Sequence, residues 1–231
     1  MEYSKLEYYL SKPRLERFLK ATMNSQAKAK KLYVVNLKVS QAFYPVLNLF
    51  EIFLRNTIDH HISNHFQDPN WIMSEKTGFM SDPTLAPSKY FLKKSVQKAE
   101  NSIKRKGNAV TPGKLIAEQS LGFWTSIFET HHYRLIKGAP IQGFPNKPEK
   151  ANRNLINKKL NKIRQFRNRI YHNEPICFNN FNIDFSKAQD IKNDVYDILN
   201  WIDIDLANYV EYFDDIQSRI EAAKKNNHKR A

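Results

Sequence analysis

Apolar residues recur at intervals of three and four along most of this chain, which is the period of an amphipathic α-helix. The clearest stretch covers residues 152–171, where one apolar face is expected from Leu155, Ile156, Leu160, Ile163, Phe166 and Ile170. Pro175 ends the pattern, since proline has no N–H for a helix interior. A longer pattern covers residues 28–66, and we expect Pro45 to kink or break it.

Weaker patterns predict the remaining helices. They cover residues 2–25 as one or two short helices, 88–105, 115–136 as one core helix or two short ones, 186–202 and 206–223. The expected helix starts are Thr111 with Pro112, Ser186 with Gln189 as a capping box, and Asp205.

Segments rich in proline and glycine predict loops at 67–87 and 138–148. No fixed-period repeat divides the chain. The sequence therefore predicts an all-α protein, with a single helical domain over residues 1–223 and a basic, disordered tail over residues 224–231.

The composition agrees with helices. The 231 residues include 6 Gly but 15 Phe and 11 Tyr, which favours helices over a strand-rich sandwich. The chain is long enough to bury a core without disulfides. Its single cysteine, Cys177, excludes an internal disulfide framework and suits a reducing cytoplasm. A buried or incidental thiol is a simpler interpretation of Cys177 than a catalytic nucleophile.

The formal net charge of +14 indicates a polyanionic partner, either nucleic acid or an anionic membrane surface. No apolar run approaches the length of a membrane span, and the first residues lack a signal-peptide pattern. We therefore expect a cytoplasmic protein with no membrane partner. Lys93 and Lys94 belong to a basic helix that would suit a phosphate backbone, although a solvated helix face explains them equally well.

One short motif carries chemistry. The hexapeptide from Arg167 to His172 has the pattern Arg-Asn-x-x-x-His, and the same pattern occurs from Arg55 to His60. Two copies are not expected by chance in a chain of this composition. Metal-independent RNA cleavage needs a proton carrier that titrates near neutrality and a fixed cation for the phosphate. Histidine and arginine supply these two groups without a metal.

The spacing of the motif sets a geometric condition. Residues five apart on a regular helix are separated by about 140° around its axis. Arg167 and His172 can therefore converge only if the last turn loosens or the arginine reaches around the helix, and Pro175 makes a loosened end plausible. The alternative interpretation is a surface arginine and a histidine placed favourably against the helix dipole.

The first copy of the motif favours structural support over catalysis. Glu51, Arg55 and Asp59 stand at successive four-residue steps, so Arg55 can pair within its own helix. His60 is expected to project towards the apolar side of that helix.

The other histidines do not suggest a metal site. His61 and His65 have the spacing of a helical metal pair, but no third ligand is indicated. His131 and His132 are adjacent and are expected to point apart. We therefore predict no metal and no cofactor.

Several segments together resemble the Abi-like proteins, which are bacterial abortive-infection proteins grouped with the HEPN superfamily of helical ribonucleases. The segments that carry this resemblance are 50–58 (FEIFLRNTI), 120–124 (SLGFW), 144–145 (FP) and 163–176 (IRQFRNRIYHNEPI). The resemblance covers most of the chain. It implies a HEPN-like helical bundle with additional helices, usually dimeric, with metal-independent ribonuclease activity at composite sites.

Residue by residue, the resemblance implies that Arg167 and His172 are the catalytic pair and that Asn168 is the polar residue beside them. Glu51, Arg55 and Asn56 match the amino-terminal element of the family, and His60 would complete a second half-site or serve as structural support. If His60 participates, one chain forms a whole site. If it does not, two copies of the Arg167/His172 pair must meet in a homodimer. RNA-binding residues are predicted to be Arg164, Arg169, Lys93 and Lys94.

The expected function is that of an endoribonuclease in bacterial phage defence or a toxin, which leaves 2′,3′-cyclic phosphate ends on RNA. Its partners would be RNA, a second copy of the chain, and an antitoxin RNA or protein. One alternative is a non-catalytic RNA-binding module with the same fold. Another is a helical partner-binding protein whose positive charge is incidental.

Overall fold

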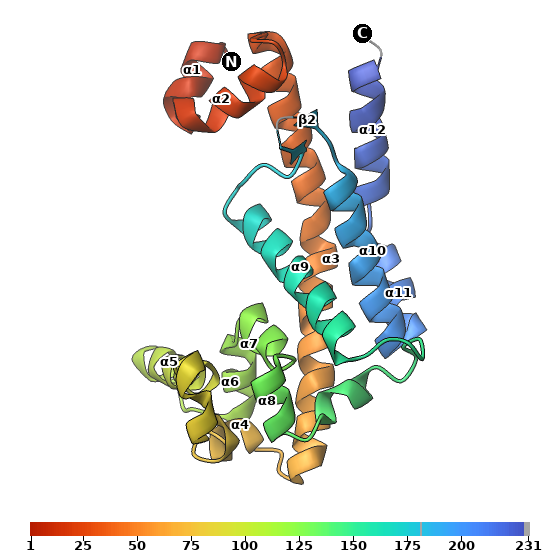
Figure 1. Ribbon diagram of the computed structural model, residues 1–231. Coiled ribbons are helices and arrows are strands. Elements are labelled where there is room, and N and C mark those ends of the chain that lie inside the picture. The colour runs from red at the N-terminus through yellow and green to blue at the C-terminus, as the bar shows by residue number, and fades with distance from the viewer. Residues whose placement is uncertain (181, 229–231) are drawn as a thin grey trace. The chain divides into compact units, whose positions relative to one another are not determined.

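Helices dominate the computed structural model, which describes residues 1–180 and 182–228 (Figure 1). The α-helices are α1 (Tyr3–Leu10), α2 (Lys12–Ala21), α3 (Gln26–Phe66), α4 (Trp71–Ser74), α5 (Phe91–Arg105), α6 (Pro112–Glu118), α7 (Leu121–Ser126), α8 (Thr130–Leu135), α9 (Arg153–Tyr171), α10 (Ser186–Ile202), α11 (Ile204–Glu211) and α12 (Ile216–His228). Short 3-10 helices are η1 (Phe79–Ser81), η2 (Pro83–Ser88) and η3 (Ala139–Gly143).

Two-residue strands β1 (Phe178–Asn179) and β2 (Asn182–Ile183) pair in the antiparallel sense. The all-α fold class is therefore confirmed. Within the described residues, no helix has both the length and the apolar character needed to cross a bilayer.

The chain divides into two compact units. Unit 1 comprises Met1–Asn48, Gln165–Asn193 and Val210–Ala231, and unit 2 comprises Leu49–Arg164 and Asp194–Tyr209. Helices α3, α9, α10 and α11 each contribute residues to both units. The single domain over residues 1–223 stays a prediction. Helix α12 continues past residue 223 to His228, and the rest of the predicted tail, residues 229–231, lies outside the described residues.

The core of unit 1 is built from helices and the segment that follows α9. Phe43 of α3 and Phe166 of α9 meet edge to face, with ring centroids 4.9 Å apart. Other buried apolar side chains of this unit are Leu15, Phe18, Leu32, Val39, Ile170, Ile176, Ile216 and Ile220. Helices α1 and α2 pack on each other within the same unit.

Pro45 lies inside α3, and the helix is continuous on both sides of it. The predicted break is therefore wrong. Proline removes one backbone hydrogen bond, but Gln41, whose carbonyl loses its partner, is exposed and accessible to water. Phe43, Val46 and Leu47 are almost fully buried, so their packing holds the helix together across the proline.

The core of unit 2 is rich in aromatic side chains. Trp71 and Trp124 are fully buried, with ring centroids 6.5 Å apart. Other fully buried members are Phe50, Leu54, Ile58, Ile62, Phe123, Phe128, Ile156, Leu160 and Ile163. Lys159 of α9 forms ion pairs with Asp194 and Asp197 of α10, the latter at 2.8 Å. The charge of Lys159 thus compensates the charges of these two carboxylates at the edge of the core.

Several helix starts differ from the prediction, whereas Thr111 is confirmed as the cap of α6. The predicted capping box at Ser186 is wrong, because the carboxylate of Asp184 accepts hydrogen bonds from both the Ser186 N–H and its hydroxyl. The single helix predicted after Asp205 is interrupted. Asp214 accepts from the Ile216 N–H at 2.8 Å and so caps α12 as a separate helix.

Candidate functional site

Helix α9 ends in a Schellman turn that determines where His172 lies. Asn173 has a left-handed backbone (φ 54°), its N–H donates to the Ile170 carbonyl at 2.9 Å, and the Glu174 N–H donates to the Arg169 carbonyl at 2.8 Å. Asparagine tolerates this conformation better than most residues. His172 is consequently the C-cap residue, directly after α9, and it is exposed.

Arg167 reaches forward along α9 to the same end. Its guanidinium carbon lies 3.9 Å from the centre of the Tyr171 ring, a cation–π contact. Its Nη1 also lies 3.5 Å from the Asn168 side-chain oxygen. Tyr171 in turn packs against Tyr44 of α3, with ring centroids 5.1 Å apart. The long arginine therefore brings its charge to the last turn of the helix, next to the residue that precedes His172.

The loop after α9 is fixed by side chains from distant parts of unit 1. Arg14 donates to the Asn173 carbonyl at 3.0 Å, and the Ile176 N–H donates to the buried side chain of Asn36 at 2.8 Å. Arg169 donates to the Pro175 carbonyl at 2.6 Å and pairs with Glu174 at 3.4 Å. The guanidinium of Arg169, predicted to bind RNA, thus holds this loop.

The next residues of the loop are fixed in the same way. Arg17 lies over the Phe178 ring at 4.5 Å and donates to the Asn180 carbonyl at 2.5 Å. Cys177 is fully buried, and burial raises the pKa of its thiol to about 12. A thiol with that pKa is a poor nucleophile, which supports the interpretation of Cys177 as structural.

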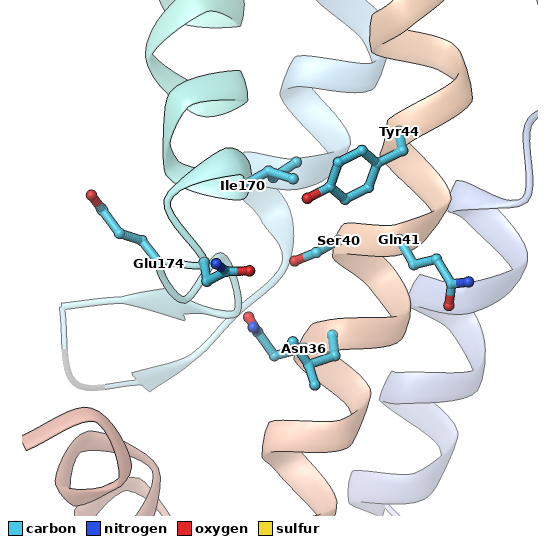
Figure 2. Close-up of a pocket in the computed structure, with 8 residues that line it drawn as sticks. Asn36, Ser40, Gln41, Tyr44, Ile170 and Glu174 are labelled. Carbon is cyan, nitrogen blue, oxygen red and sulfur yellow. The ribbon is translucent and has the colours of Figure 1, made fainter. Parts of the chain in front are cut away.

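A small cavity opens between α3 and the end of α9 (Figure 2). Its volume is about 70 Å³, and its lining residues are Asn36, Leu37, Ser40, Gln41, Tyr44, Ile170, Asn173 and Glu174. This space has room for about two water molecules, whose share of liquid volume is about 30 Å³ each. A nucleotide does not fit, so any RNA site at this end of α9 lies on the surface.

The second copy of the motif lies in unit 2, on α3. His60 is exposed, and its Nε2 lies 3.0 Å from the Asn64 side-chain nitrogen, so the prediction that it faces the apolar side is wrong. Arg55 is half-buried and donates from Nε to the Asn56 side-chain oxygen at 3.4 Å.

Asp59 belongs to the same copy of the motif, but its carboxylate bonds to a residue outside it. It accepts a hydrogen bond from the Trp71 indole N–H at 2.7 Å. Burial raises the pKa of this carboxyl group, although the indole donor opposes that effect. Asp59 thus anchors the buried tryptophan.

The other predicted RNA-binding residues lie in unit 2. Arg164 is half-buried and donates to the Asn161 side-chain oxygen at 3.0 Å. On α5, Lys93 is half-buried and Lys94 is exposed. One face of α5 lines an open groove of about 630 Å³, formed by Lys94, Gln97, Lys98, Asn101, Ser102, Arg105 and Lys106. Four of these seven residues are basic.

The sequence did not indicate that Glu129, His131 and His132 form a cluster. The rings of His131 and His132 lie close together, with centroids 4.1 Å apart, so the prediction that they point apart is wrong. Their neighbour Glu129 lies 3.3 Å from His131. His132 is fully buried, and burial lowers its pKa to about 4.

Comparison with known proteins adds no relative. No family model matches the chain, and neither a curated protein nor a solved structure matches it.

Proposed function

We propose that this chain is a metal-independent endoribonuclease of the HEPN type that acts in the bacterial cytoplasm, in phage defence or as a toxin. One observation carries the proposal: the guanidinium of Arg167 contacts Tyr171 in the last turn of α9, and the exposed His172 follows directly, where a Schellman turn ends the helix. The all-α fold and the net charge of +14 are compatible with it.

Each residue of the motif has a distinct role in this proposal. His172 takes the proton of the ribose 2′-hydroxyl and returns a proton to the leaving oxygen. Arg167 stabilises the negative charge that develops on the phosphorus oxygens. Asn168, whose side-chain oxygen faces the guanidinium at 3.5 Å, orients Arg167. The products carry 2′,3′-cyclic phosphate ends.

The proposed site is shared between two copies of the chain. The cavity at this end of α9 is too small for a nucleotide, so the phosphodiester must bind on an open surface. Tyr44 and Tyr171 each expose 40% of their area there. A second copy packed on these rings would bring a second Arg167/His172 pair to the same phosphodiester and exclude water from it. An antitoxin RNA or protein would act by covering this surface.

Cleavage of total RNA by the purified protein in EDTA tests the proposal. Removing a general acid–base group lowers a rate by about 100-fold or more. We therefore expect His172→Ala and Arg167→Ala to lose cleavage to at least that extent. The exposed His65 and Arg134 supply matched controls, and His65→Ala and Arg134→Ala should cleave as the wild type does. Undiminished cleavage by both α9 variants would remove the assignment.

A non-catalytic RNA-binding module is the second candidate function, and the basic groove on α5 favours it. Lys94, Lys98 and Arg105 line this groove at the spacing of one helix face. Such a surface would bind phosphates without cleaving them, and its affinity would fall steeply with salt. Salt-sensitive RNA binding without cleavage, weakened by Lys94→Ala and Lys98→Ala, would support this candidate over the nuclease.

A further inference from the structure

Three potential metal ligands gather at the start of α8, within unit 2. Glu129 precedes the helix, and His131 and His132 lie in its first turn. One ligand atom from each residue lies within 4.8 Å of the other two. The Glu129 Oε2 is 3.3 Å from the His131 Nε2, and the ring centroids of His131 and His132 are 4.1 Å apart. The three residues are therefore close enough to share one ion.

The ring of His132 is already oriented for metal binding. Its Nδ1 lies 2.8 Å from the Ser126 carbonyl oxygen, which can only accept, so Nδ1 carries the proton and Nε2 carries the lone pair. The side chain is fully buried, and within the described part of the chain its Nε2 has no hydrogen-bond partner. Metal-binding histidines commonly donate their other N–H to a backbone carbonyl in this way.

We infer that Glu129, His131 and His132 bind one divalent transition-metal ion of the zinc type, with water completing the coordination. Bond lengths of about 2.0–2.1 Å place two ligands of a tetrahedral ion about 3.3 Å apart. The spacing between Glu129 and His131 already has this value. The side chains of Glu129 and His131 are 42% and 39% exposed, so they can rotate to close the wider spacings while His132 stays fixed.

The ligand types indicate which metal ions the site would bind. Two imidazoles and one carboxylate suit Zn²⁺, Co²⁺ or Ni²⁺, whereas Ca²⁺ and Mg²⁺ prefer oxygen ligands. The ion would also satisfy the lone pair of His132 and link the end of α7, through Ser126, to the start of α8. The site stabilises unit 2 and is independent of RNA cleavage, which is assayed in EDTA.

Titration with Co²⁺ tests the inference, because Co²⁺ bound to nitrogen ligands shows d–d absorption bands in the visible range. The full-length protein is stripped with EDTA, transferred to metal-free buffer and titrated with Co²⁺ alone. We expect bands that saturate at one equivalent per chain and disappear when Zn²⁺ is added, because Zn²⁺ competes for the same ligands. Zn²⁺ should also raise the temperature of unfolding, since it binds only the folded protein.

The variants assign the ligands. His131→Ala and Glu129→Gln change partly exposed residues and should fold normally, yet each should lower the affinity for Co²⁺ by about 10-fold to 100-fold or more. His65→Ala is the control, because it would disrupt the alternative pair of His61 and His65 on α3. Binding lost in His65→Ala but kept in His131→Ala would overturn the inference, as would a wild-type protein that binds no Co²⁺.

Discussion

The guanidinium carbon of Arg167 lies 3.9 Å from the centre of the Tyr171 ring, one turn further along α9. Side chains on a helix normally lean towards its amino-terminal end, so the ring of Tyr171 lies over the preceding turn, where the guanidinium of Arg167 contacts it. The contact brings a fixed cation to the exposed end of the helix, where His172 follows Tyr171 directly. Tyr171 is thus the residue that holds the guanidinium of Arg167 next to the position that precedes His172.

Replacing Tyr171 should misplace Arg167 without removing it. A cation–π contact at a partly exposed site contributes about 0.5–1 kcal/mol, which corresponds to a change in rate of about twofold to fivefold. We expect Tyr171→Ala to cleave RNA more slowly by this factor, while Tyr171→Phe keeps the ring and the wild-type rate. Initial rates in EDTA measure the effect. Equal rates for the two variants would show that the ring does not orient Arg167.

Asn173 should be the residue that best tolerates glycine in the loop after α9. Its left-handed backbone (φ 54°) costs most side chains about 1–2 kcal/mol. We expect Asn173→Ala to lower the free energy of unfolding by about 1 kcal/mol and Asn173→Gly to leave it nearly unchanged. Urea unfolding measures both. A stable Asn173→Ala protein would contradict the role given to the Schellman turn.

Lys159 should matter more to stability than its neighbour Lys158. Lys159 pairs with Asp194, and the two side chains are only 14% and 10% exposed. Burial opposes the charged form of Lys159, but hydrogen bonds to Asp194 and Asp197 outweigh it and raise its pKa. Removing one partner of a buried pair costs about 3–5 kcal/mol.

The comparison uses two substitutions of the same kind. We expect Lys159→Met to lower the midpoint of thermal unfolding strongly, and Lys158→Met, at an exposed position, to change stability by at most about 0.5 kcal/mol. Circular dichroism measures both midpoints. Similar midpoints for the two variants would mean that the buried pair contributes little.

Stability should fall with acid because of His132. The unfolded chain binds a proton at this residue near pH 6.5, whereas burial lowers the pKa in the folded protein to about 4. The unfolded state is therefore favoured increasingly as the pH falls between these values, by roughly 3 kcal/mol in total, from 1.36 kcal/mol per pKa unit. Below the lower value the contribution changes no further.

Urea unfolding in EDTA, between the two pKa values of His132, measures this loss. The expected signature is a pH dependence that is weaker in His132→Gln than in the wild type. His131→Gln, at the partly exposed neighbouring position, should keep the wild-type dependence. A His132→Gln protein that loses stability as steeply as the wild type would assign the acid sensitivity to other groups.

The sequence predicted the helices well where the apolar period was uninterrupted. Five of the six residues predicted for the apolar face of α9 are buried, and only Leu155, at 37% exposure, is not. Pro45 misled the prediction because the local rule against proline ignores the packing of Phe43, Val46 and Leu47. Caps were also uncertain, since Asp184 and Ser186 both offer the side-chain oxygens that a helix start needs.

The candidate site was only partly predictable. The motif located Arg167 and His172, but the contacts that fix the following loop join residues far apart in the chain. Arg14 and Asn36 lie 159 and 140 positions before their partners, Asn173 and Ile176. No periodicity encodes such pairs. The cluster of His131 and His132 was missed because adjacency alone does not fix the orientation of two rings.

The ends of the RNA products test the role of His172 and Arg167 most directly. Attack by the ribose 2′-hydroxyl leaves a 2′,3′-cyclic phosphate on one fragment and a 5′-hydroxyl on the other. Mass spectrometry of RNA cleaved in EDTA should find these ends for the wild-type protein, with little product from His172→Ala. Fragments with 5′-phosphate ends, or the same amount of cyclic phosphate from His172→Ala, would contradict the proposed mechanism.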